Sequence, residues 1–298
     1  MKQSKLTTVM ESITPVKAEK YLNHNTTNRT LRVGVAEQYE ADMKAGRWTQ
    51  CTAPIAFFED GDIADGQHRL WAVIGSGVAQ DFLVMRGLPR EAAMNIDTGL
   101  GRSLVDNGKI SGLDTGLSTK LIAVCKAVEM GDKTWGRFSN SERALFVDKH
   151  RAAGEWAVKR APKGATLKGA NVLAAIARAW YVEPNKERLA QFCDVLSTGF
   201  SEGVDDTAAV ALRNYLQGVA GPTGRRAAAA DAWQPAFLKC QNAIWYFMRR
   251  KALTVIRPTD TERYPLPTGT KSALPKMAAS KIGKLVAAKA KEAKSKEK

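Results

Sequence analysis

The patterning of the chain changes near Gly112, and this change most constrains the fold. Short strands and helices alternate before residue 110, whereas long Ala-, Leu- and Val-rich stretches with helical spacing follow Gly112. We therefore expect an α+β protein with a small α/β domain over residues 1–110 and an all-helical domain over 111–267. Residues 268–298 are rich in Ala and Lys and lack aromatic residues, so we expect a disordered basic tail.

Residues 1–27 read as a loose lead-in with one short ordered segment. The patterns after it predict helices over 33–46, 67–76 and 102–107, strands over 53–58, 63–64 and 81–86, and a short helix after Pro89. In the second domain, helical patterns cover 117–130, 141–160, 168–181, 184–197, 206–218 and 227–251. We expect the aromatic runs 180–181 and 245–247 to belong to the core of that domain.

The charge of the chain is distributed unevenly. The 298 residues carry a net charge of +15, yet residues 1–110 hold 13 basic and 13 acidic side chains, so the excess lies after residue 110. This asymmetry indicates a polyanionic partner, with nucleic acid as the first candidate. The alternative is a charged surface and tail that serve only solubility.

Several protein classes are excluded by composition. No apolar run approaches the roughly 18 residues of a membrane span, and the N-terminus lacks the apolar centre of a secretory signal. Four widely spaced cysteines form no CxxC pair and have no histidine at ligand spacing, so we expect neither a zinc site nor a disulfide framework. A cytoplasmic protein with no membrane contact fits these observations.

The run Asp65-Gly66-Gln67-His68-Arg69 is the most specific feature of the sequence, because it joins a predicted strand to a predicted helix. A glycine at such a break lets the backbone approach a ligand, and a helix N-terminus favours anions. Arg69 can bind a phosphate with two N–H groups, and His68 can donate to an oxyanion or move a proton. The structural alternative is that His68 caps a neighbouring carbonyl and Arg69 pairs with Asp65.

This run, with Leu70 and Ala72, resembles the signature of the ParB/sulfiredoxin superfamily, especially its DGQHR-type phage and plasmid members. The resemblance covers about residues 13–110 and includes Asn28-Arg29, the run 39–48 and Pro54-Ile55. It extends to an Asp-Thr-Gly…Arg…Asp element, which corresponds here to Asp97, Thr98, Gly99, Arg102 and Asp106.

The resemblance implies nucleotide binding, with Asp65, Gly66, Gln67, His68, Arg69, Asn28, Arg29, Thr98 and Arg102 as phosphate-binding residues. A nucleoside triphosphate, ATP or CTP with Mg²⁺, is the implied ligand. Gln67 stands where sulfiredoxins carry cysteine, which excludes sulfinic-acid repair. The glutamate of the partition proteins is also missing, but Gln67 could orient a water or a phosphate oxygen.

Asp97 is the main candidate for catalysis, beside His68 and Gln67. A carboxylate in an Asp-Thr-Gly loop could hold Mg²⁺ or act as a general base. The alternative is that Asp97 and Thr98 cap the following helix. His24 and His150 have no neighbours suited to metal binding or nucleophilic chemistry, and we expect them at the surface or an interface.

The basic excess suggests where nucleic acid would bind. Gly-containing loops and helix ends place bare cations where they could contact a phosphate backbone, without sequence specificity. These residues are Lys163, Lys168, Arg225, Arg226, Arg249, Arg250, Lys281 and Lys284. The alternative for Arg249 and Arg250 is complementing the dipole of the helix that they end.

The leading hypothesis is therefore a ParB-like, DNA-associated protein that binds a nucleoside triphosphate and hydrolyses it or transfers its phosphoryl group. The first alternative is a metal-dependent nuclease of the same fold. The second is a non-catalytic DNA-binding protein. A homodimer is compatible with each of the three.

Overall fold

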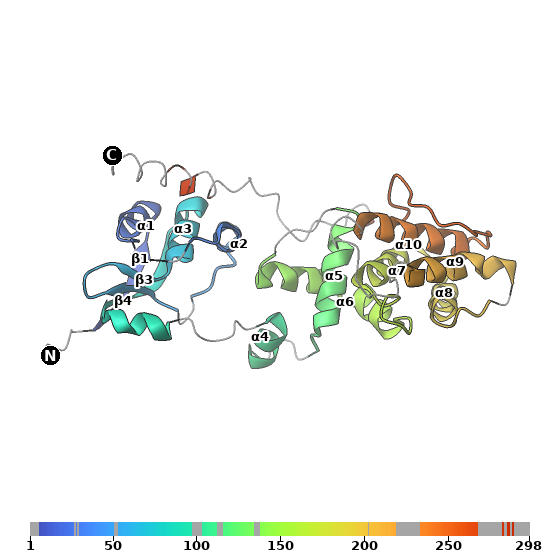
Figure 1. Cartoon of the computed structure of the whole chain (residues 1–298), viewed down its shortest axis with the longest axis horizontal. Helices are drawn as coiled ribbons and strands as arrows, with labels where there is room; N and C mark the ends of the chain where they lie inside the picture. Colours follow the sequence, from blue (N-terminus) through green and yellow to red (C-terminus); the bar gives the residue numbers. More distant parts are fainter. Residues whose placement is uncertain are drawn as a thin grey trace. The chain divides into compact units, whose positions relative to one another are not determined.

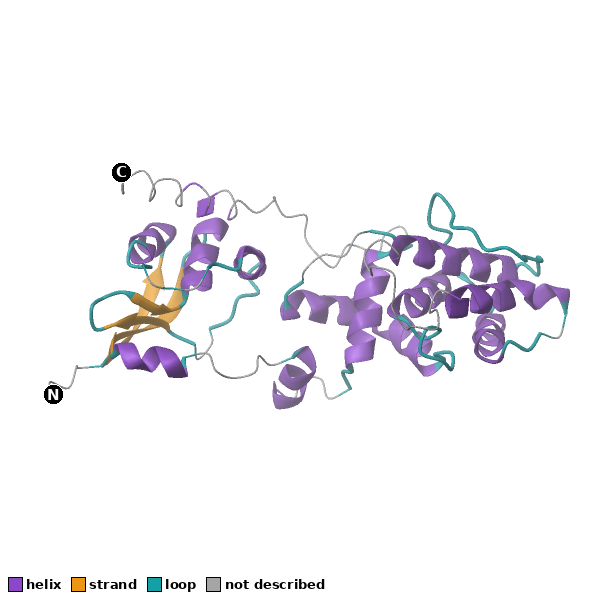
Figure 2. Cartoon of the chain, in the orientation of Figure 1, coloured by secondary structure: helices purple, strands orange, loops and turns teal. Residues whose placement is uncertain are grey.

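The computed structural model describes residues 6–26, 28, 30–50, 53–96, 103–111, 116–133, 138–201, 203–218 and 233–267, together with 282, 285, 286 and 288. The fold is mixed α+β, as the sequence predicts. The chain divides into two compact units (Figures 1 and 2). Unit 1 comprises residues 1–101, 137–141 and 275–298, and unit 2 comprises residues 102–136 and 142–274.

Unit 1 is built on a four-stranded mixed sheet with the order β1-β4-β2-β3. Its elements are β1 (Thr7–Ile13), α1 (Pro15–Leu22), α2 (Val33–Lys44), β2 (Ile55–Phe58), β3 (Ile63–Asp65), α3 (Gln67–Ser76), β4 (Gln80–Leu88) and the 3₁₀ helix η1 (Arg90–Asn95). β2 pairs parallel with β4, whereas the β1–β4 and β2–β3 pairs are antiparallel. β2, β3, β4, α2 and α3 agree with the sequence prediction to within two or three residues.

The core of unit 1 lies between the sheet and the helices that gather beside it (Figure 2). Every residue of β2 is buried, which places this strand in the interior of the sheet. Ile55 and Phe57 join a cluster with Leu70 and Trp71 of α3. The turn between β3 and α3 therefore packs against the buried core of unit 1.

Two elements of unit 1 differ from the expectation. The expected lead-in contains a full strand, β1, and a capped helix, α1, in which the Thr14 side chain accepts a hydrogen bond from the Lys17 N–H. The sequence pattern does not predict β1, because most residues of this strand are exposed and only Ile13 is buried.

The second difference is in the tail. Residues 268–298 are expected to be disordered, but part of this segment packs against the core of unit 1. Ile282 is fully buried and joins the cluster of unit 1, and Val286 packs against the same cluster. Two apolar side chains four residues apart share one face of a helix, which gives even this lysine-rich segment something to bury. The remaining tail residues, apart from 285 and 288, lie outside the described residues.

The described residues of unit 2 form helices joined by loops, and they include no strand. It contains α4 (Leu104–Ser111), α5 (Thr119–Met130), α6 (Asn140–Lys159), α7 (Ala170–Val182), α8 (Lys186–Thr198), the 3₁₀ helix η2 (Val204–Asp206), α9 (Thr207–Gly218) and α10 (Trp233–Met248). Its core is rich in alanine along α7, where eight successive residues are buried. Phe247 is fully buried and its aromatic neighbours pack partly against this core, so the expected core position of these runs is confirmed.

Candidate functional site

Gly66 forms the break between β3 and α3, where the sequence places it. Its φ of +109° lies in the left-handed region, and a Cβ there would lie 2.6 Å from Ile55 Cδ1 and 3.3 Å from Ile55 Cα. Because Ile55 is fully buried, this side chain has little room to move away. Both the backbone conformation and the available space therefore require glycine.

Arg69 and Asp65 brace this turn. The Arg69 Nη2 donates to Asp65 Oδ2 at 3.0 Å and to the carbonyl of Pro54 at 2.7 Å, while Asp65 Oδ1 accepts from the Gly66 N–H at 2.6 Å. The Arg69 side chain is only 12% exposed. The structural alternative for this pair is thus realised, and Arg69 ties the start of β2 to the start of α3.

The brace leaves part of the Arg69 guanidinium unused. Neither Nε nor Nη1 has a hydrogen-bond partner among the described residues, and Nε is enclosed by the protein. Buried donors are rarely left in this state. Arg69 therefore combines two structural bonds on Nη2 with one donor group, Nη1, that is neither enclosed nor partnered by a described residue at the first turn of α3.

A chain of amides supports the other side of the turn. Asn25 Nδ2 donates to Gln67 Oε1 at 3.3 Å, and Asn28 Nδ2 donates to Asn25 Oδ1 at 2.7 Å and to the Ile63 carbonyl at 2.6 Å. Gln67 is buried. Asn28 therefore acts here through its neighbours, and Asn25 is a residue of the site that the sequence prediction did not include.

His68 occupies the first turn of α3 with its ring partly exposed. Its Nε2 accepts a hydrogen bond from the Arg32 N–H at 3.2 Å, so the ring receives a bond and does not cap a carbonyl through this nitrogen. An accepting Nε2 places the proton of the neutral ring on Nδ1.

The four predicted residues Arg29, Asp97, Thr98 and Arg102 lie outside the described residues.

The predicted nucleic-acid contacts have different surroundings. Lys163 and Lys168 are exposed in the loop between α6 and α7. Arg249 instead pairs with Glu183 at 3.0 Å and stacks on Trp245, and Arg250 pairs with Asp205 at 3.1 Å. Arg225, Arg226, Lys281 and Lys284 lie outside the described residues. Within the described part of this set, the two lysines are the cations whose side chains form no hydrogen bond or ion pair with described residues.

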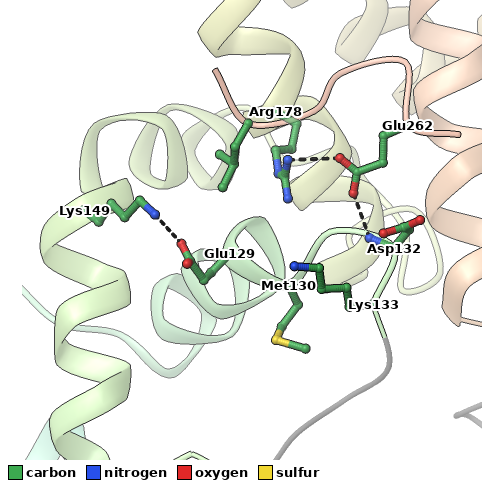
Figure 3. Close-up of a pocket in the computed structure, with 8 residues that line it drawn as sticks. Glu129, Met130, Asp132, Lys133, Lys149, Arg178 and Glu262 are labelled. Atoms are coloured by element: carbon green, nitrogen blue, oxygen red, sulfur yellow. Dashed lines mark hydrogen bonds and ion pairs between the residues drawn. The ribbon is translucent and has the colours of Figure 1, made fainter. Parts of the chain in front are cut away.

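A cavity of about 310 Å³ in unit 2 was not predicted (Figure 3). It is lined by Glu129, Met130, Asp132, Lys133, Lys149, Arg178, Glu262 and Leu266. These side chains come from α5 and the loop after it, from α6 and α7, and from the segment after α10. Six of the eight are charged, and no motif in the sequence connects residues this far apart.

His150 belongs to a buried network beside this cavity, which corrects its expected place at the surface. The ring is fully buried, with Nε2 2.8 Å from Glu129 Oε2 and Nδ1 2.9 Å from the Tyr181 hydroxyl. Burial lowers the pKa of His150, so the ring is neutral, donates to Glu129 and accepts from Tyr181. Burial alone would raise the pKa of Glu129, but bonds from His150 and Lys149 outweigh it and hold that pKa at about 2.

The metal-ligand and thiol side chains of the described residues have the following arrangement. The described residues contain no cluster of three or more His, Cys, Asp or Glu side chains that could hold a metal ion. Cys125, Cys193 and Cys240 are free and buried, and burial raises the pKa of each thiol to about 12. At neutral pH these three cysteines are therefore unreactive thiols.

No described helix has the length and apolar character needed to cross a membrane.

Comparison with known proteins gives no match. No protein-family model, no curated protein and no solved structure is similar to this chain. The resemblance to the ParB/sulfiredoxin superfamily therefore rests on the motif residues and remains a hypothesis.

Proposed function

We propose that the chain binds the phosphate groups of a nucleoside triphosphate, ATP or CTP with Mg²⁺, at the turn between β3 and α3. We further propose that unit 1 has the ParB/sulfiredoxin fold and that the protein is cytoplasmic and associates with DNA. One observation carries the phosphate site. Arg69 is fixed by Asp65 and Pro54, and its Nη1 has no partner among the described residues beside the start of a ten-residue helix.

The geometry of the turn supports this proposal in a second way. The left-handed Gly66 lets a ligand approach the backbone without meeting a Cβ, and the positive end of the α3 dipole favours an anion. A phosphate oxygen that accepts from Arg69 would satisfy a donor for which the protein supplies no partner. Asn28, Gln67 and His68 would then keep the loop and the first turn of the helix in place.

Phosphoryl transfer or nucleotide hydrolysis is the chemistry that we propose for this site. Asp97 would act as the general base or as a ligand to Mg²⁺, and Thr98 and Arg102 would contribute to phosphate binding. A metal-dependent nuclease would use the same residues on a backbone phosphate. A non-catalytic DNA-binding protein would keep the pocket as a switch.

Nucleic acid would bind without sequence specificity to unit 2 and the tail. Lys163 and Lys168 support this part of the proposal because both are exposed. In addition, Lys168 lies close enough to Lys120 to help burial lower the pKa of that lysine. Accumulated positive charge of this kind attracts a phosphate backbone.

Nucleotide titrations followed by hydrogen exchange test the phosphate site. We expect one of ATP, CTP, GTP or UTP with Mg²⁺ to protect the peptides around 62–72. Arg69→Lys should weaken this binding by about tenfold, since the single nitrogen of lysine cannot hold Asp65 and a phosphate as the planar fork of arginine can. Arg69→Lys retains a cation at the brace, which makes it a better probe than Arg69→Ala. His68→Ala should also weaken binding, with exposed His24→Ala as the matched control.

Three results would separate the proposed activities. Loss of turnover in Asp97→Asn but not in Asp81→Asn, an exposed aspartate of β4, would support nucleotide chemistry at the turn. Metal-dependent cleavage of DNA that is lost with Asp97 would favour the nuclease. Nucleotide protection without turnover or cleavage would favour the switch. Absence of protection at 62–72 by every nucleotide would refute the phosphate site.

A further inference from the structure

We propose that the cavity of unit 2 binds a small organic molecule through its carboxylate or phosphate group, with Arg178 and Lys133 as the cations that hold the oxyanion. The inference is independent of the turn in unit 1. It rests on three observations: a buried arginine whose Nη2 has no hydrogen-bond partner among the described residues, a lysine of the lining with which none of those residues forms an ion pair, and a glycine whose missing Cβ lets Arg178 and Glu262 pack against the backbone.

Arg178 is a buried residue of the cavity lining. It is only 4% exposed, and its Nε donates to the Val128 carbonyl at 2.7 Å while Nη1 donates to Glu262 Oε2 at 3.0 Å. Nη2 has no hydrogen-bond partner among the described residues. This nitrogen is not among the enclosed atoms that lack a partner, so water or a ligand oxygen can reach it and accept a charge-assisted hydrogen bond.

Gly131 leaves the room that the paired side chains of Arg178 and Glu262 occupy. A Cβ at this position would lie 2.5 Å from Arg178 Nη2 and 2.0 Å from Glu262 Oε1. Any other residue would therefore displace the pair. The φ of +59° also favours glycine at this position, directly after α5.

Lys133 supplies the second cation. Its side chain lines the cavity and lies near Arg178 and Glu262 in Figure 3. No described residue forms an ion pair with its ammonium group, although its charge acts on Glu262. Lysine and arginine together, one a point charge and the other a planar fork, are well suited to one oxyanion.

The remaining groups define what else the ligand can be. Glu129 is neutralised by Lys149 at 2.7 Å, so it does not repel an anion strongly. Asp132 and Glu262 balance the two cations, and this balance disfavours a polyanion such as duplex DNA. Met130 and Leu266 give the cavity an apolar part, and its volume is in the range of small-molecule sites. A small organic anion matches all these features.

Aromatic probes of different charge test the inference on the full chain. Phenyl phosphate, benzoate and benzyl alcohol share one ring and differ in the group that Arg178 and Lys133 would bind. Hydrogen exchange followed by mass spectrometry should show protection of peptides over 126–133 and 258–267 by one or both anions and not by the alcohol. The same data report on peptides 62–72, so failure here and failure of the proposed nucleotide site are distinguishable.

Two substitutions with opposite expected effects complete the test. Lys133→Gln should weaken binding and Asp132→Asn should strengthen it, each by about three- to tenfold, because one removes an attractive charge and the other a repulsive one. Exposed Lys159→Gln, on α6 and outside the lining, is the matched control. Protection by either anion with these opposite shifts would support the inference. No protection at millimolar anion, or equal affinity in all three variants, would overturn it.

Discussion

At the scale of single residues, Glu11 shows how one carboxylate secures an edge strand. It lies on β1 and accepts from Arg86 of β4 at 2.6 Å and from the Tyr21 hydroxyl of α1 at 2.6 Å, and it pairs with Lys17 at 2.8 Å. Burial would raise the pKa of Glu11, but the bonds from Arg86, Lys17 and Tyr21 lower it from 4.5 to about 2. The network therefore holds a strand that buries little apolar surface.

This pKa gives a prediction for acid. A folded pKa below the unfolded value means that Glu11 stabilises unit 1 above pH 4.5, and that this stabilisation is lost as the pH falls from about 4.5 to about 2. Glu11→Gln should cost on the order of 1–3 kcal/mol at pH 7 and remove that part of the acid dependence. Hydrogen exchange of peptides covering 7–13 at pH 7 and pH 3 measures both effects. Exposed Glu19→Gln on α1 should change neither, and equal behaviour of the two variants would contradict the prediction.

Arg69 carries a second prediction at this scale. Its bonds to Asp65 and Pro54 are made by a side chain that is 12% exposed, so Arg69→Ala should destabilise unit 1 by about 2–3 kcal/mol even without ligand. The readout is exchange of the peptides over 54–58 and 63–70. Arg32→Ala is a control, because Arg32 contributes its backbone N–H to His68. An unchanged free energy of opening in Arg69→Ala would show that the brace contributes little.

The sequence predicts residues well where local chemistry decides. Gly66 is identifiable because a strand, a glycine and a helix follow one another directly. His150 is not, because its burial depends on Glu129, 21 residues earlier, and on Tyr181, 31 residues later. The lining of the cavity around Arg178 escapes prediction for the same reason, since Glu262 lies 84 residues away. Tertiary partners of this kind leave no periodic signal.

At the scale of elements, the helices of unit 2 can be predicted from local sequence pattern, whereas β1 and the buried part of the tail depend on tertiary partners. The helices of unit 2 carry apolar residues at helical spacing, and their bounds agree with the predicted ranges to within a few residues. The predicted start of the last helix, residues 227–232, lies outside the described residues. β1 is an exposed edge strand, and its pairing with β4 is set by the backbone register and by Glu11. The buried position of Ile282 depends on a surface of α3 that lies some 200 residues earlier in the chain.

The tail segment gives the prediction at this scale. Ile282 is fully buried beside Gly75 of α3, where a Cβ would lie 2.7 Å from Ile282 Cγ1 and 2.9 Å from the Glu40 carboxylate. Ile282→Asp should release the segment and cost unit 1 about 1.5–3 kcal/mol. Leu285→Asp is the control, because Leu285 is 37% exposed. Exchange of peptides over 279–290 should become as fast as in an unstructured chain only in the first variant.

Gly75→Ala separates this contact from helix propensity. Alanine in a helix normally adds about 1 kcal/mol relative to glycine, so a helix with no neighbour would gain stability. Here the added methyl group should displace Ile282, and the peptides over 279–290 should exchange faster. Slower exchange of the α3 peptides, with unchanged exchange of the peptides over 279–290, would show that the tail does not occupy this surface in solution.

At the scale of the whole molecule, unit 1 is assembled from both ends of the chain. Residues 275–298 are assigned to the same compact unit as residues 1–101, and unit 2 lies between them in the sequence. Truncation after residue 267 therefore removes a buried side chain of unit 1 together with the basic charge of the tail. Any loss of nucleic-acid affinity in such a truncation combines two effects, and a cleaner variant has to keep Ile282.

The double variant Lys281→Gln, Lys284→Gln meets this condition and gives the last prediction. Each lysine that neutralises a DNA phosphate adds about 0.9 to the slope of log affinity against log salt, so the pair should reduce the slope by about 1.8 if both bind phosphates. Fluorescence anisotropy of a labelled duplex between 50 and 300 mM salt, a range of about sixfold, measures the slope. Lys2→Gln, Lys20→Gln removes the same charge from the other end of the chain and should leave the slope unchanged. Equal slopes in the two double variants would mean that the tail contributes only to net charge, and the nucleic-acid interface would then have to be sought on unit 2 alone.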